Sequence, residues 1–125
     1  MNLPSALREW LAADHETAPE QDVSAREQDR IAERLATLTR PLRPRRGAVD
    51  GAVVMHHPTG RAFAAAYGDR LLVRTSSARA TLAAEPIAAL PGWVAIDPFP
   101  ADVAFERGTN VLRDLLARAF ADAGR

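Results

Sequence analysis

The stretch that decides the fold is residues 51–75, GAVVMHHPTGRAFAAAYGDRLLVRT. Three runs rich in β-forming residues, 52–57, 61–67 and 70–75, are separated by two turn sequences. Pro58-Thr59-Gly60 places a glycine where the backbone needs a positive φ. Gly68-Asp69 has the composition of a two-residue type II′ hairpin turn, with glycine first. The pattern predicts a three-stranded antiparallel meander.

Alternation within the meander predicts which side chains share a face of the sheet, because successive side chains of a strand point to opposite faces. The second run places Phe63, Ala65 and Tyr67 together. The third run places Leu71 and Val73 on one face and Leu72 and Arg74 on the other. His56 and His57 are adjacent, so we expect them to point to opposite faces.

Two helices are predicted before the meander. Residues 3–13 carry Leu3, Leu7, Trp10 and Leu11 on one helical face. Residues 14–23 are polar and contain Pro19, which is typical of a linker. A capping box at 24–27 begins a helix over 25–39, which the prolines at 41 and 44 end. Residues 40–46 are then expected to form an extended basic connector.

Three further elements are predicted after the meander. A short helix over 78–84 ends at Pro86, and residues 93–97 form a fourth strand with Val94 and Ile96 on one face. Thr109 or Asn110 caps a closing helix over 111–122, and Gly124 stands where a left-handed C-terminal residue is favoured. The expected inner face of the closing helix is formed by Leu112, Leu115, Leu116, Ala119 and Phe120.

These elements predict an α+β fold: a two-layer sandwich in which an antiparallel sheet, the meander plus a fourth strand, carries helices packed on one face. The length of 125 residues fits a single main domain at 24–125, preceded by a helix and linker at 1–23. The chain has no cysteine, which excludes disulfides and thiolate chemistry. No signal peptide or membrane span is recognisable, so we expect a cytoplasmic protein without membrane contact.

The order of elements, with particular residues at particular places, resembles the MmcQ/YjbR-like family and the related TfoX amino-terminal domain. The matching pieces are Gly60-Arg61-Ala62-Phe63, the strand 69–74, Gly92-Trp93-Val94 and the helix 112–120. The likeness covers about residues 25–122 and departs at Met55-His56-His57, in the first 24 residues and between 75 and 91. The resemblance implies a CyaY-like or double-wing-like fold, and members of the family are often described as DNA-binding.

Charge is distributed unevenly although the net charge is zero. Residues 1–39 hold eight acids and four arginines, residues 40–80 hold eight arginines and two acids, and all sixteen basic residues are arginine. Arginine forks pair well with phosphate oxygens. A nucleic-acid surface is therefore predicted from Arg43, Arg45, Arg46, Arg61, Arg70 and Arg74. The alternative is that these arginines lie on a solvated face and pair with neighbouring acids.

Protein binding is the rival hypothesis for function. Leu7, Trp10 and Leu11 make the first helix amphipathic, and it could dock on its own sheet, on a second copy or on another protein. Docking on its own sheet is the favoured outcome of the three. If the helix instead binds another protein, the chain would act as an adaptor or regulatory domain.

Neither catalysis nor metal binding is indicated. The chain has no lysine, no phosphate-binding glycine loop and no nucleophile elbow around Ser76 or Ser77. His15, His56 and His57 lack the converging partners that a metal site needs. We therefore expect a non-enzymatic binding protein with no catalytic residue, no metal and no cofactor.

Overall fold

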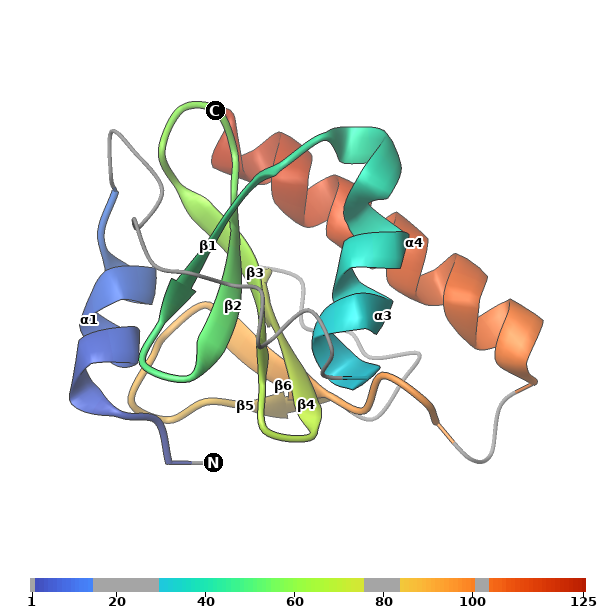
Figure 1. The fold of residues 1–125 in the computed structure, drawn as a ribbon, viewed down its shortest axis with the longest axis horizontal. Helices are drawn as coiled ribbons and strands as arrows, with labels where there is room; N and C mark the ends of the chain where they lie inside the picture. The colour runs from blue at the N-terminus through green and yellow to red at the C-terminus, as the bar shows by residue number, and fades with distance from the viewer. Residues whose placement is uncertain (1, 15–29, 76–83, 101–103) are drawn as a thin grey trace.

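The computed structural model describes residues 2–14, 30–75, 84–100 and 104–125. In these ranges a six-stranded antiparallel sheet carries helices on it, which confirms the predicted α+β layered fold (Figure 1). The helices are α1 (Ser5–Ala12), α3 (Arg30–Thr39) and α4 (Phe105–Ala123), with the 3-10 turn η1 at Arg40–Leu42. The strands are β1 (Arg45–Val49), β2 (Ala52–His56), β3 (Ala62–Tyr67), β4 (Arg70–Arg74), β5 (Ala84–Pro86) and β6 (Trp93–Ile96).

The sheet has the strand order β1-β2-β3-β4-β6-β5, so the predicted meander is β2–β4 and the predicted fourth strand is β6. The expected extended connector over 40–46 is wrong at both ends: Arg40–Leu42 form the 3-10 turn η1, and β1 begins at Arg45 and pairs with β2. Asp50 and Gly51 join the two strands with φ of 46° and 86°. Two positive φ values are those of a type I′ hairpin turn, for which Asp-Gly is a favoured sequence. The Asp-Gly signal was present in the sequence and was missed.

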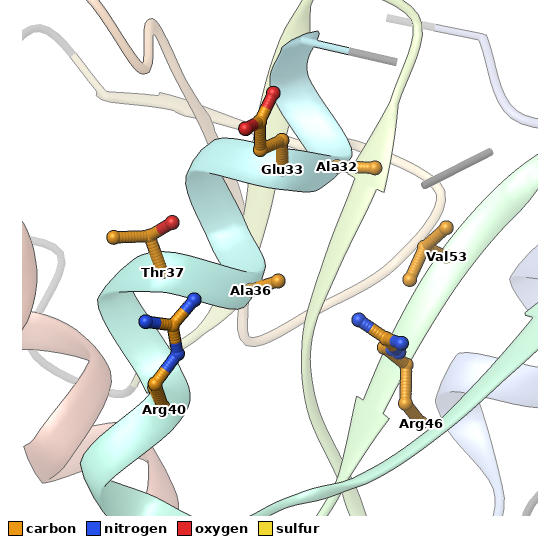
Figure 2. A pocket seen from close by; sticks show the side chains of 7 residues that line it. All are labelled: Ala32, Glu33, Ala36, Thr37, Arg40, Arg46 and Val53. Atoms are coloured by element: carbon orange, nitrogen blue, oxygen red, sulfur yellow. The ribbon is translucent and has the colours of Figure 1, made fainter. Parts of the chain in front are cut away.

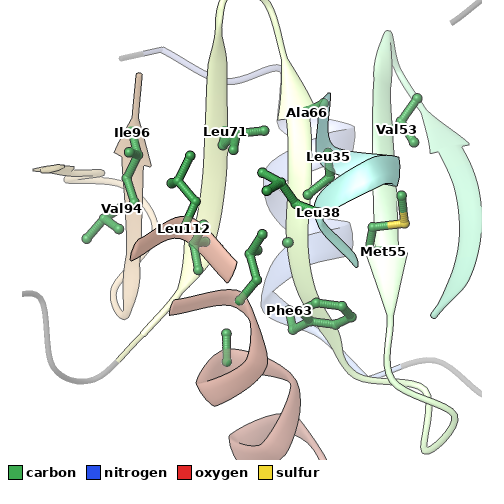
Figure 3. Close-up of a cluster of buried hydrophobic side chains, with 14 of the residues drawn as sticks. Leu35, Leu38, Val53, Met55, Phe63, Ala66, Leu71, Val94, Ile96 and Leu112 are labelled. Carbon is green, nitrogen blue, oxygen red and sulfur yellow. The ribbon is translucent and has the colours of Figure 1, made fainter. Parts of the chain in front are cut away.

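One face of the sheet is covered by α3 and α4, which supply the helical layer of the larger hydrophobic cluster (Figure 3). Leu35 and Leu38 of α3 and Leu112 and Leu116 of α4 are all buried there. Alternate residues of the strands face them, as predicted for Leu71 with Val73 and for Val94 with Ile96. These contacts fix the position of α3, and therefore of the basic segment that follows it.

The opposite face is covered by α1 together with residues 87–93. Leu7 and Leu11 are fully buried against the sheet, in a second cluster with Ile87, Leu90 and Trp93. Figure 1 shows α1 on the other side of the sheet from α3 and α4. The favoured expectation for α1, docking on its own sheet, is confirmed. Thus α3 and α4 share one face of the sheet, and α1 lies on the other face.

A β-bulge changes the expected faces of β3. Met55 pairs with Ala64, but the next residue of β2, His56, pairs with Ala62, so Phe63 is the extra residue. Phe63 consequently joins the cluster under α3 and α4, whereas Ala65 belongs to the cluster under α1. The prediction that Phe63 shares a face with Ala65 and Tyr67 is wrong for this reason.

The closing helix is longer than predicted. It begins at Phe105 after Ala104, so Thr109 and Asn110 are not its cap. Thr109 lies inside the helix, where its hydroxyl donates a hydrogen bond of 2.8 Å to the carbonyl oxygen of Phe105. The predicted inner face of α4 is confirmed, because Leu112, Leu116 and Ala119 are buried.

The end of the closing helix also differs. Gly124 has a φ of −85° instead of the expected left-handed value, and its N–H bonds to the carbonyl of Ala121. A Cβ at this position would lie 2.6 Å from Nε2 of His57. The glycine is therefore required for close packing against His57 and not for backbone freedom.

Several predictions fall on residues outside the described ranges. The capping box at 24–27, most of the linker at 14–23 and most of the helix at 78–84 belong to them. Ala84, the last residue of that predicted helix, begins β5 instead. Within the described ranges, no helix is both long and apolar enough to cross a membrane.

Candidate nucleic-acid interface

The strongest concentration of positive charge lies where α3 leads into the sheet. Residues 40–46 contain Arg40, Arg43, Arg45 and Arg46, all exposed, and no acid stands between Glu33 and Asp50. We call these four arginines the basic edge. They extend from η1 into β1, which is an edge strand of the sheet.

The local backbone geometry directs the side chains of the basic edge to different sides of the sheet. Pro41 is the second residue of the 3-10 turn η1, and Arg43 caps the end of that turn with a left-handed φ of 52°. In β1 the cross-strand partner of Arg45 is His56 and that of Arg46 is Met55. Met55 lies in the cluster beneath α3, so Arg46 is on the α3 side of the strand and Arg45 on the α1 side.

A groove separates α3 from β1 and β2 beside the basic edge (Figure 2). It has a volume of about 250 Å³. Ala32 and Ala36 present small side chains on the helix side, and Val53 and Arg46 lie opposite them. Short side chains on α3 leave this space open. The groove is lined by Ala32, Glu33, Ala36, Thr37, Arg40, Arg46 and Val53.

Arg61 lies apart from the basic edge and is held by an acid. Its Nε and Nη2 donate to the two carboxylate oxygens of Asp14 at 3.0 and 3.2 Å, a bidentate pair just after α1. The hydrogen bond and the charge of Asp14 raise the pKa of Arg61 above its usual value. This is the alternative arrangement that the sequence left open, an arginine paired with a neighbouring acid.

Arg74 and Arg70 lie at opposite ends of β4. Arg74 is half-buried, and burial is the main cause that lowers its pKa, followed by repulsion from Arg61. Arg70 follows the hairpin turn, and its guanidinium lies 3.5 Å from the carboxylate of Asp69. The six predicted nucleic-acid residues therefore divide into Arg43, Arg45 and Arg46 at the basic edge and Arg61, Arg70 and Arg74 on the sheet.

The predicted protein-binding residues are used within the chain. Leu7 and Leu11 are buried under α1. Trp10 is half-buried, and its indole N–H donates a hydrogen bond of 2.7 Å to Nε2 of His56. His56 is itself fully buried, so this polar contact is part of the interface between α1 and the sheet.

The two adjacent histidines point to opposite faces, as predicted. His57 lies on the α4 side, where its ring centroid is 4.5 Å from that of Phe120. Its Nδ1 accepts a hydrogen bond of 3.1 Å from the backbone N–H of Thr59. In the described part of the chain, no group of three or more histidines and acids is placed to hold a metal ion.

Two functional candidates were missed by the sequence reasoning. Arg40 had been placed on the connector without a role, although its spacing from Arg43 was visible. Arg34 is given no role by the sequence analysis, and it is buried. Its position was hidden in the sequence because its neighbours, Phe99 and Phe105, come from distant segments.

Comparisons of the chain with protein-family models, with curated proteins and with solved structures gave no match. The likeness to the MmcQ/YjbR-like family therefore stays a prediction.

Proposed function

We propose that this chain is a small binding protein that contacts the phosphates of nucleic acid through the basic edge, and that it acts by binding and not by catalysis. The observation that carries the proposal is the placement of four exposed arginines within seven residues beside a groove. Guanidinium groups at such spacing can contact successive phosphates, and these contacts position a duplex without reading its sequence.

The proposal narrows the predicted interface. Arg61 is bound to Asp14, and Arg74 is half-buried beside it. Arg70 lies at the far end of β4, next to the β3–β4 turn. All three lie outside residues 40–46, just before β3 or on β4. Arg40 replaces them as the fourth member of the interface.

The alternative is protein binding through α1, using Leu7, Trp10 and Leu11. Leu7 and Leu11 are buried against the sheet, so they can meet a partner only when α1 leaves its place. Trp10 keeps part of its surface exposed, but its N–H is bonded to His56. The arrangement favours a structural role for this helix, whereas all four arginines of the basic edge are exposed.

A salt titration with duplex DNA tests the proposal. The full chain is compared with a variant in which Arg43, Arg45 and Arg46 are replaced by Gln. Each phosphate contact contributes about −0.9 to the slope of log K against log salt concentration. We expect the slope of the variant to be smaller in magnitude by about 2–3, with weaker binding for every duplex sequence. Fluorescence anisotropy at several salt concentrations gives this slope.

The matched control replaces Arg113, Arg118 and Arg125, three exposed arginines of α4 and the residues after it. It removes the same charge from another surface and should leave the slope unchanged. An equal loss in the two variants would show general charge attraction and would overturn the proposal. If the unaltered chain does not bind duplex DNA even at low salt, the proposal is wrong and protein binding becomes the leading interpretation.

A further inference from the structure

Arg34 is a buried cation that has no acidic partner among the described residues. Its exposed fraction is 9%. Nε donates to the carbonyl of Pro98 at 3.2 Å, and Nη2 donates to the hydroxyl of Thr109 at 3.0 Å. In the described part of the chain no carboxylate lies within ion-pair distance of it. A guanidinium has five N–H donors, and these two neutral acceptors are the ones that the described residues supply to it.

Aromatic rings enclose this guanidinium from two sides. Its central carbon lies 5.0 Å from the ring centre of Phe99 and 4.7 Å from that of Phe105. Phe99 is held in place by an Asx turn, in which its N–H donates to a carboxylate oxygen of Asp97 at 2.9 Å. Cation–π contacts offset part of the cost of burying a charge, but they supply no hydrogen-bond acceptor.

A cavity opens directly beside Arg34. It has a volume of about 80 Å³, which is room for a small ion but not for a nucleotide. The first turn of α4 forms one wall through Ala104, Phe105 and Gly108, and residues 98–100 close another side. Figure 1 shows the chain after β6 passing the start of α3 on its way to α4. The cavity is lined by Arg34, Phe99, Pro100, Ala104, Phe105 and Gly108.

The remaining electrostatics of this site also favour an anion. The N-terminal N–H groups of α4 have no side-chain cap, because residue 104 is alanine. These groups carry the positive end of the helix dipole. Arg30 lies over the same Phe99 ring at 4.0 Å, and Arg113 is near enough to lower the pKa of Arg34 after the larger effect of burial. Among the described acids nearest in sequence, Glu33 and Glu106 are exposed, and a carboxylate oxygen of Asp97 accepts from the N–H of Phe99 at 2.9 Å.

We propose that this cavity binds a small oxyanion, a phosphate or a carboxylate group, with Arg34 and the first turn of α4 as its ligands. The anion would supply a counter-charge that no described residue gives Arg34, and it would accept the hydrogen bonds left open at the helix start. Phe105 has 68% of its surface exposed at the mouth of the cavity. An apolar part of the ligand would lie against this ring.

The direct test is an NMR titration of the full chain with inorganic phosphate at constant ionic strength. We expect saturable shifts of the backbone amides of residues 105–107 and of the Arg34 side-chain N–H. Arg34→Gln should weaken this binding on the order of tenfold or more, because a charge-assisted hydrogen bond is lost. Arg118→Gln, an exposed change later in α4, is the control and should leave the affinity unchanged.

A second pair of variants keeps the test decisive if Arg34→Gln fails to fold. Ala104→Asp places a carboxylate at the helix start, where it caps α4 and competes with the ligand. Ala104→Asn caps the helix without a negative charge. Both should raise the unfolding temperature. Asp should weaken phosphate binding on the order of tenfold more than Asn does, because it carries the competing charge.

The choice of probe separates the two sources of the oxyanion. Acetate and phosphate titrations show which shape is preferred, and phenyl phosphate should bind more tightly than phosphate if Phe105 contacts the ligand. The absence of saturable shifts with both anions would overturn the proposal and leave Arg34 as a structural link between α3 and α4. Unaltered phosphate affinity in Ala104→Asp would overturn it as well. The basic-edge variant should retain the site, so the proposed function and this inference fail separately.

Discussion

The two faces of the sheet are covered in different ways. On one face, α3 and α4 bury leucines, alanines and Phe63 in a cluster in which apolar side chains make the contacts (Figure 3). On the other face, the eight-residue helix α1 is held by Leu7 and Leu11 and by two polar contacts, Trp10 with His56 and Asp14 with Arg61. The first face is covered by two helices through apolar contacts, whereas the second is covered by the short helix α1 together with residues 87–93.

This difference bears on where function can lie. A short helix with few buried residues has a low local unfolding free energy, whereas helices that complete the main core unfold with the whole domain. The basic edge follows α3, so its position is fixed by the stronger of the two layers. A binding surface built on α1 would share the weaker attachment of that helix. The predictions below test whether the two faces differ in this way.

Phe63→Ala should cause the largest effect, because it empties the bulged position beneath α3 and α4. Its ring is fully buried and lies 5.2 Å from that of Phe120, edge to face. We expect a loss of about 3–5 kcal/mol in the free energy of unfolding, and this loss should affect all helices and strands together. Chemical denaturation followed by circular dichroism measures it, and Tyr67→Ala on the opposite face is the control. A loss below about 1 kcal/mol would contradict the assignment of this face as the main layer.

Trp10→Phe should have a smaller and more local effect. The change keeps an aromatic ring but removes the N–H that donates to Nε2 of buried His56. Loss of a donor to a buried acceptor costs about 1–3 kcal/mol. We expect faster hydrogen exchange in α1 and little change in α3 and α4, measured by NMR. Glu9→Gln, at the exposed neighbouring position, is the control. Equal acceleration in all three helices would show that the two faces unfold together.

Much of the fold could be predicted from the sequence, because local signals agreed with the tertiary structure there. Strand alternation in β4 and the Gly68-Asp69 turn are examples, and so is the inner face of α4. One error, the missed hairpin of β1 and β2, did have a local signal in Asp50-Gly51. Two other errors came where a longer-range contact decided the outcome. The bulge at Phe63 depends on pairing with β2, and Gly124 is explained by packing against His57. Neither contact leaves a pattern in the nearby sequence.

The candidate sites were less predictable than the fold. The arginines at 43, 45 and 46 could be named from their spacing, and their common position at one edge follows from β1, which had been missed. The pairing of Arg61 with Asp14 joins residues far apart in the sequence. Arg34 is similar, because its environment is assembled from α3, α4 and the segment after β6. The numbers of arginines and acids along the chain could not show which arginines are exposed, which are paired with an acid and which are buried.

Asp14→Asn should have the smallest effect on stability. It also tests whether the α1 face takes part in binding nucleic acid. Both partners of the pair are substantially exposed, and exposed ion pairs contribute little. We therefore expect a change in unfolding temperature smaller than that of Trp10→Phe. The variant leaves Arg61 without its carboxylate, next to half-buried Arg74, so positive charge on the α1 face rises.

Duplex DNA binding by Asp14→Asn then distinguishes the basic edge from the sheet face. If nucleic acid contacts the basic edge alone, the slope of log K against log salt concentration stays as in the unaltered chain, because no phosphate contact is added. A slope larger in magnitude by about 1 would mean that the released Arg61 contacts a phosphate, which would extend the interface across the α1 face. Asp69→Asn, which releases Arg70 at the other end of β4, is the matched control. It removes one carboxylate in the same way, so a similar change in both variants would reflect net charge and not position.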